Sequence, residues 1–224
     1  MPGKRKKTLL LGGAFNDSDG SPREEGHQDH VACRAQALGT LVGLDPMLVE
    51  DLRIAGKYHD EGKKDERFQK LLRNDQKTKN NELQAKSWFQ MSRSRERNLR
   101  NTYEIHVWRH EQRSVAEFHC ACESHEQLKA MSEFDKQLIK RLIGTSHGHG
   151  RATFRHETAY LLPQEKFDFL NVSPELNDIS KRLFDSGEWE SVIDHTNQRY
   201  GFWGISYLEA LLRAADITCS KEGL

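Results

Sequence analysis

Apolar residues recur at helical spacing along much of the chain, and clusters of Gly, Pro and polar residues separate the runs. The first run begins at Asp29 and ends at Gly43, and its apolar residues share one face: Val31, Ala35, Leu38 and Val42. The next run predicts a helix with Asp45 as its N-cap and Pro46 at its first position. One stripe of that helix consists of Leu48, Leu52, Ala55 and His59.

Further helices are predicted over residues 111–121, 135–147 and 203–220. The last pattern is the clearest, because one face carries Ile205, Leu208, Leu212 and Asp216. No convincing alternation of apolar and polar residues predicts a strand, so we expect an all-α fold. One domain is expected over residues 26–224, with polar insertions near 73–104 and 150–195. Residues 1–25 lack periodicity and predict a flexible leader or linker.

Composition narrows the class of protein. The formal net charge is zero, so attraction to nucleic acid must be local if it exists. The four cysteines form no CxxC pair and indicate reduced thiols. No apolar run approaches the roughly 18 residues of a membrane span, and the apolar stretch after the basic start is too short for a signal peptide. We expect a soluble cytoplasmic protein with no membrane partner.

Candidate chemistry begins on the last predicted helix. Asp216 follows Leu212 on the core-facing stripe, where a bare carboxylate is strongly disfavoured. It therefore needs a partner, either an arginine or a metal ion. His59 ends another buried stripe and Asp60 follows it, so one helix end offers a nitrogen and an oxygen ligand together. A lone histidine on such a face is more often a hydrogen-bonded core residue than a ligand.

More histidines cluster near the ends of predicted helices. His27 precedes the first buried stripe, His110 stands at the start of a helix, and "TSHGHG" places His147 and His149 around a glycine after another helix. Taken singly, solvent-exposed histidines beside a helix end explain each of them. Together they form a set of imidazoles and carboxylates that suits Mn, Fe, Co, Ni or Zn, and the lack of thiolates argues against a structural zinc site.

The order of these residues on an all-α chain resembles the HD superfamily of metal-dependent phosphohydrolases. The segment "LRIAGKYHDEGKKDERFQKLL" is similar to the HD nuclease of type I CRISPR interference systems. The segments "RHEQRSVAEF", "GTSHGHGRATF" and "YGFWGISYLEALLRAADITCS" are similar to later motifs of that family, and the last two look closest to the type I-G branch. The resemblance covers most of residues 27–220.

The resemblance implies an HD-superfamily helical domain with a metal site between core helices. It assigns a first divalent ion to His27, His59, Asp60 and Asp216, with Asp60 bridging to a second ion held by His110 and a histidine pair. The first member of that pair is Ser146 here, so only His147 remains, and His149 or water is left to fill the position. Two ions are expected, and Lys63 would face the substrate phosphate beside the catalytic Asp60.

The family also implies the reaction, the hydrolysis of phosphodiester bonds in single-stranded DNA during antiviral defence. Its partners would be a helicase domain or subunit and the CRISPR RNA-guided surveillance complex. Between residues 63 and 113, fourteen Lys and Arg residues stand against seven Asp and Glu residues. Aromatic residues interleave with this charge, so the sequence predicts DNA contacts at Lys86, Trp88, Arg93, Arg95 and Arg97. The alternatives are a phosphohydrolase acting on nucleotides or cyclic nucleotides, and a scaffold whose metal site has decayed.

Overall fold

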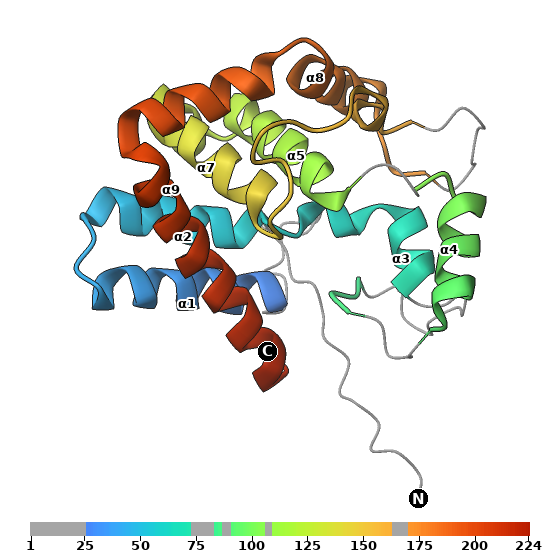
Figure 1. Ribbon diagram of the computed structural model, residues 1–224, viewed down its shortest axis with the longest axis horizontal. Coiled ribbons are helices and arrows are strands. Elements are labelled where there is room, and N and C mark those ends of the chain that lie inside the picture. The colour runs from blue at the N-terminus through green and yellow to red at the C-terminus, as the bar shows by residue number, and fades with distance from the viewer. Residues whose placement is uncertain (1–25, 73–82, 87–90, 106–108, 163–169) are drawn as a thin grey trace, which may run out of the picture.

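The computed structural model describes residues 26–72, 83–86, 91–105, 109–162 and 170–224, and every regular element within them is a helix (Figure 1). This confirms the predicted all-α class. In chain order the elements are α1 (His27–Leu41), α2 (Pro46–Tyr58), the 3₁₀ turn η1 (Glu61–Lys64), α3 (Glu66–Leu72), α4 (Arg93–Thr102), α5 (His110–Ser124), α6 (Glu126–Lys129), α7 (Glu133–Thr145), the 3₁₀ turn η2 (His156–Ala159), α8 (Pro174–Asp185) and α9 (Glu188–Glu222).

Helices α1 and α2 form the base of the fold and lie side by side in Figure 1. The side chain of Asp45 accepts a hydrogen bond from Met47 N and Pro46 opens α2, as the sequence predicts. The two helices approach closely at Gly56, where an added Cβ would lie 2.9 Å from Ala32 Cα. A residue with a side chain would force the pair apart, and with it the end of α2 that carries His59.

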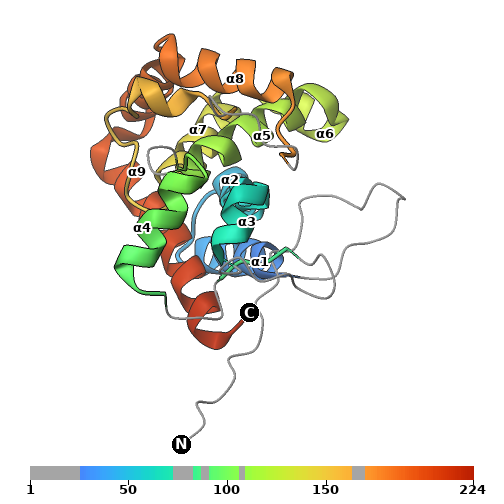
Figure 2. The same cartoon turned by 90° about the vertical axis from the view of Figure 1, so that its right-hand side faces the viewer.

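Helix α9 crosses both α1 and α7, and its two halves meet at Gly201, whose φ of 67° is not helical (Figure 1). The second half buries the predicted stripe, because Ile205, Leu208 and Leu212 are each at most 4% exposed. The first half buries Trp189, whose ring packs against Phe154 and Phe184. Figure 2 shows α7, α8 and the start of α9 stacked above the α1–α2 base. One contiguous apolar core joins these layers.

Two helices lie in segments that the sequence analysis assigned to polar insertions. Helix α4 lies within residues 73–104 and contains no buried residue, so it has no strong apolar stripe to reveal it. Helix α8 lies within residues 150–195 and buries Leu176, Ile179 and Leu183. That spacing is helical, so helix α8 was predictable from the sequence, and the expectation of a polar insertion there is wrong. The predicted leader, residues 1–25, lies outside the described residues. Among the described helices, none has the length and apolar character that crossing a membrane requires.

Candidate metal centre

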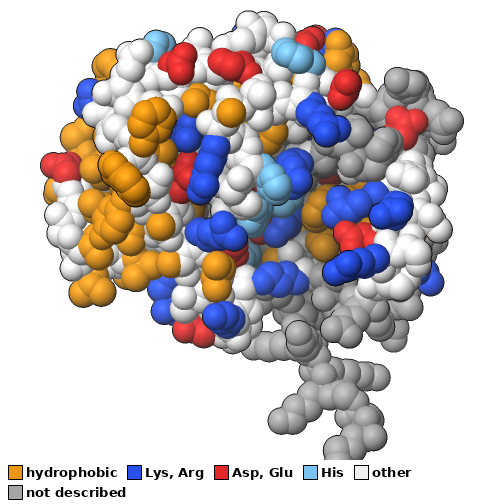
Figure 3. Space-filling model, in the orientation of Figure 1, with side chains coloured by type: hydrophobic (Ala, Val, Ile, Leu, Met, Phe, Trp, Pro, Cys, Tyr) orange, Lys and Arg blue, Asp and Glu red, His pale blue; other side chains and the backbone are white. Residues whose placement is uncertain are grey.

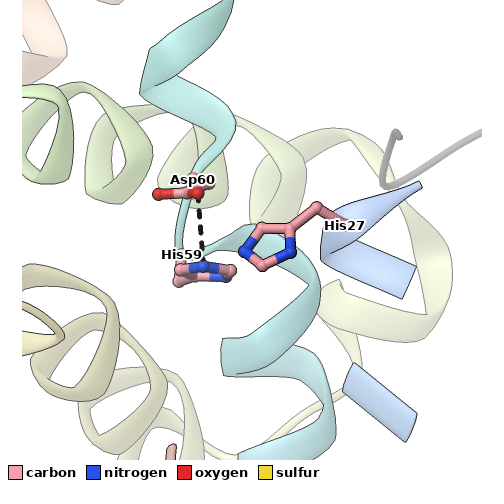
Figure 4. A group of neighbouring side chains, drawn as sticks. All are labelled: His27, His59 and Asp60. Carbon is pink, nitrogen blue, oxygen red and sulfur yellow. Dashed lines mark ion pairs between the residues drawn. The ribbon is translucent and has the colours of Figure 1, made fainter. Parts of the chain in front are cut away.

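Four of the predicted ligands, all histidines, gather around one carboxylate, that of Asp60. Two groups of candidate ligand atoms share it, and within each group the atoms lie within 4.8 Å of one another: His27, His59 and Asp60, and Asp60, His110 and His147. Figure 4 shows His27 reaching from the start of α1 toward His59 and Asp60 at the end of α2. His110 opens α5, and His147 lies in the turn after α7. Residues far apart in sequence therefore meet because four helix ends converge.

Hydrogen bonds to backbone oxygens orient two of the imidazoles. His59 Nδ1 lies 2.7 Å from Gly56 O, and His27 Nδ1 lies 2.7 Å from Leu224 O. A carbonyl oxygen can only accept, so each Nδ1 carries a proton and Nε2 is the ring nitrogen that faces the carboxylates. His59 Nε2 lies 3.4 Å from Asp60 Oδ2. Fixing one ring nitrogen so that the other faces the site is the usual arrangement around metal-binding histidines.

The donor atoms around Asp60 are buried and lack hydrogen-bond partners. Asp60 is 0% exposed, and its Oδ1 lies 3.2 Å from His110 Nε2 and 3.6 Å from His147 Nε2. The buried atoms without a hydrogen-bond partner include His59 Nε2, Asp60 Oδ1, His110 Nε2 and His147 Nε2. Each such atom costs about 1–3 kcal/mol when nothing satisfies it. Divalent cations between these atoms would satisfy all of them, so the residues fit the metal that the donor set implies.

Electrostatics set the protonation of this cluster. Burial alone would raise the pKa of Asp60, but His59 and Lys63, together with the His110 and His147 rings that face its Oδ1, hold that pKa well below its ordinary value. Burial lowers the pKa of His110, so its ring is neutral at physiological pH. Burial also opposes charge on His59, but the adjacent Asp60 carboxylate outweighs burial and raises the pKa of His59. The centre is thus an ionised carboxylate whose negative charge a bound cation would balance.

Close backbone packing fixes η1 against α5. An added Cβ at Gly62 would lie 1.9 Å from His110 O, so only glycine fits there. Ser114 Oγ donates to His59 O at 3.0 Å and accepts from Gly62 N at 2.8 Å. These contacts hold Asp60 opposite His110.

The evidence that this cluster could hold a metal is the chemistry of its ligand atoms. No protein-family model, curated protein or solved structure matches the chain. Imidazole nitrogens and carboxylate oxygens without thiolates suit first-row divalent ions such as Mn, Fe, Co, Ni and Zn. The four cysteines are free, and neither candidate group contains one.

Three other predicted site residues occupy distinct positions. Asp216 Oδ1 lies 2.9 Å from His27 Nε2, so it reaches the centre through that imidazole and belongs to neither group. Lys63 Nζ donates to Asp60 Oδ2. His149 is exposed and lies outside both groups, whereas Ser146 is 4% exposed with its Oγ unpartnered.

Two residues beside the centre were not predicted as site residues. Glu111 is 1% exposed, and its Oε2 lies 3.3 Å from His110 Nδ1, on the other side of the ring from Asp60. An acid in the first turn of a helix usually just complements the dipole, which hides this role. The ring of Phe68 lies 5.3 Å from that of His110. Apart from its place in the segment that resembles the HD nuclease, nothing in the sequence marked Phe68 as a neighbour of His110.

The predicted DNA-contact residues are exposed wherever the structure describes them. Lys86 is exposed, and so are Arg93, Arg95 and Arg97 on α4. Arg93 and Arg97 are four residues apart and share a face of the helix, while Arg95 points to another. Trp88 lies outside the described residues. Helix α4 packs on α3, where the Arg100 guanidinium lies 6.0 Å from the centre of the Phe68 ring. The basic helix is thus linked to His110 through one aromatic ring.

Proposed function

We propose that this chain is a metal-dependent nuclease of the HD superfamily that hydrolyses phosphodiester bonds in single-stranded DNA. The observation that carries the proposal is the convergence of buried, unpartnered imidazole nitrogens on Asp60. A structural core histidine finds a hydrogen-bond partner, because leaving it without one is costly. Several unpartnered nitrogens facing one ionised carboxylate are explained if bound cations supply the missing partners.

Each group would hold one divalent ion, with Asp60 shared by both groups. Bound divalent ions lower the pKa of water and offset the charge that grows on the leaving oxygen during in-line displacement. The protein keeps Asp60 ionised and His110 neutral, which are the states that bind metal. Lys63, whose Nζ donates to Asp60 Oδ2, would supply an ammonium for a substrate phosphate beside the bound metal.

Two further features support single-stranded DNA as the substrate. The residues after Asp60 resemble the HD nuclease of type I CRISPR interference, and exposed arginines lie on α4, which packs on the helix α3 that carries Phe68 beside His110. The helicase partner, the CRISPR RNA-guided complex, the role in antiviral defence and the cytoplasmic location all follow from that resemblance. They belong to the proposal on the same footing as the substrate.

The test combines metal analysis with a cleavage assay. We expect purified protein to bind Mn, Fe, Co, Ni or Zn and to cut circular single-stranded DNA with at least one of them. Asp60→Asn and His59→Ala should abolish cleavage while circular dichroism shows the helical fold intact. Matched controls are Asp178→Asn, whose side chain is 73% exposed, and His195→Ala, which is exposed on α9. Both controls should cut like the wild type.

Other outcomes point to the alternatives. Preferential turnover of mononucleotides or cyclic nucleotides would replace DNA with a small substrate and keep the metal chemistry. A protein that binds no stoichiometric transition metal and cuts nothing is a scaffold. Undiminished cutting by Asp60→Asn would refute the assignment of the centre.

A further inference from the structure

A cavity of about 330 Å³ lies beside the metal centre, and the proposed metal chemistry does not use it. Its polar lining residues are Arg109, Gln112, His149, Thr153, Arg155 and Thr158, and among the residues that the structure describes no acidic one lines it. Arg109 precedes the candidate ligand His110, and His149 follows His147 by two residues. The cavity therefore adjoins the centre on the side of the second ligand group. In Figure 3, histidines near the middle of the face are surrounded by Lys and Arg side chains.

The cationic side chains of this cavity are not neutralised by strong ion pairs. The Arg109 guanidinium is 44% exposed, and the acid it pairs with, Glu111, is 4.0 Å away. Arg155 is exposed on the rim. Arg109 is also the N-cap of α5, a helix of 15 residues, so the positive end of the helix dipole adds to the same field. Two guanidinium groups and a helix N-terminus thus face one space.

Gln112 supplies a buried donor at the same place. It is 0% exposed, and its Oε1 accepts from Arg109 N at 3.4 Å. Its Nε2 has no hydrogen-bond partner, which makes it a donor without an acceptor at the wall of a polar cavity. The two threonines contribute less, because Thr158 Oγ1 donates to Arg155 O and Thr153 Oγ1 donates to the Glu190 carboxylate. The arginines, His149 and Gln112 therefore dominate the cavity.

We infer that this cavity binds a second phosphate of the substrate strand, next to the phosphate that is cut at the metal centre. This inference rests on the proposed function and adds a subsite to it. An excess of donors, with no carboxylate among the described lining residues, matches a phosphodiester, and bidentate guanidinium contacts suit its oxygens. The volume is at the lower end of ligand pockets and leaves room for a sugar beside the phosphate. His149 acts in this subsite, and its exposed position outside the ligand groups fits that role.

The first experiment measures DNA binding without metal, so it does not depend on catalysis. Fluorescence anisotropy of a labelled oligothymidylate in EDTA would compare the wild type with Arg155→Gln and with the double variant Arg109→Gln/Arg155→Gln. We expect the double variant to bind about tenfold more weakly and the dependence of log Kd on log salt to fall by about one per lost arginine. The control is Arg182→Gln on α8, whose side chain is 53% exposed. It should bind within about twofold of the wild type, since Arg182 does not line the cavity.

The second experiment separates the subsite from the centre. Bis(4-nitrophenyl) phosphate is a diester with a single phosphate, so it cannot occupy the cavity and the centre together. We expect the loss in kcat/KM of the double variant to be about tenfold larger for the oligonucleotide than for this diester, with Mn content unchanged. Equal losses on both substrates, or DNA binding by both variants equal to that of the control, would overturn the subsite. A wild type that binds DNA but neither holds metal nor cuts either substrate would refute the proposed function and leave the EDTA comparison valid.

Discussion

A buried acid on α2, Asp51, gives the sharpest test of the structure that does not depend on metal binding or catalysis. Asp51 is 2% exposed, and its Oδ2 has no hydrogen-bond partner. Burial, followed by the negative charges of Asp135 and Glu50, raises the pKa of Asp51 from 3.8 to about 7. The folded protein therefore holds a proton on Asp51 over a pH range in which the unfolded chain has released it.

The sign of the effect on stability follows from linkage. Between pH 3.8 and about 7 the folded state binds more protons than the unfolded state at this residue, so its contribution to stability falls as the pH rises. Above the folded pKa the loss levels off at about 4 kcal/mol, from about 1.36 kcal/mol per pH unit. Asp51→Asn removes the ionisation and keeps the shape. We expect the variant to be more stable than the wild type by about 2–4 kcal/mol at pH 8.

Urea unfolding of both proteins at several pH values from about 4 to about 8 would measure this difference. The gain in the free energy of unfolding should be near zero at the acidic end and should grow with pH until about 7. Asp178→Asn serves as the control, because its exposed carboxylate should show no comparable gain. A difference that is constant with pH, or that favours the wild type at pH 8, would show that Asp51 is not buried against acids as the structure places it.

Two other substitutions test separate parts of the fold. Asp65→Ala should lower the free energy of unfolding, measured in urea, by about 3–5 kcal/mol. The reason is that it removes the carboxylate that pairs with the buried Arg67 and Arg113, each at 2.8 Å. A loss below about 1 kcal/mol would contradict that ion cluster. Ser146→His should raise Mn occupancy or cleavage rate by supplying the missing imidazole beside His147, and elemental analysis would check it. Occupancy equal to or below that of the wild type would show that the second group needs no further ligand.

The parts of the site that the sequence revealed are those carried by helix periodicity. His59 and Asp216 stand in register with buried leucines, and a 3.6-residue period projects such residues to the same side. The structure places both near Asp60 for that reason. Helix ends marked by Asp45 and Pro46 were also predictable, because capping depends on neighbours in the sequence.

Contacts over long sequence separations were not predictable. Arg113 reaches Asp65 across 48 residues, and Arg67 donates to Leu161 O across 94 residues. Nothing in the local pattern distinguishes these arginines from the exposed ones around them, although both are at most 2% exposed. The same limit applies to Glu111 and to the cavity beside Arg109. Their roles depend on which helix ends meet, and one chain's periodicity does not encode that.

The two ligand groups differ in how many of their atoms already have partners. The resemblance assigns a first ion to His27, His59, Asp60 and Asp216, and in the second group Ser146 stands where the family has the first histidine of a pair. In the structure, His27 Nε2 is already bonded to Asp216, and Lys63 already occupies Asp60 Oδ2. On the opposite side, Asp60 Oδ1 and the Nε2 atoms of His110 and His147 all lack partners. A cation gains most where it satisfies buried atoms without displacing existing contacts, so we expect a cation to bind first at the group of Asp60, His110 and His147.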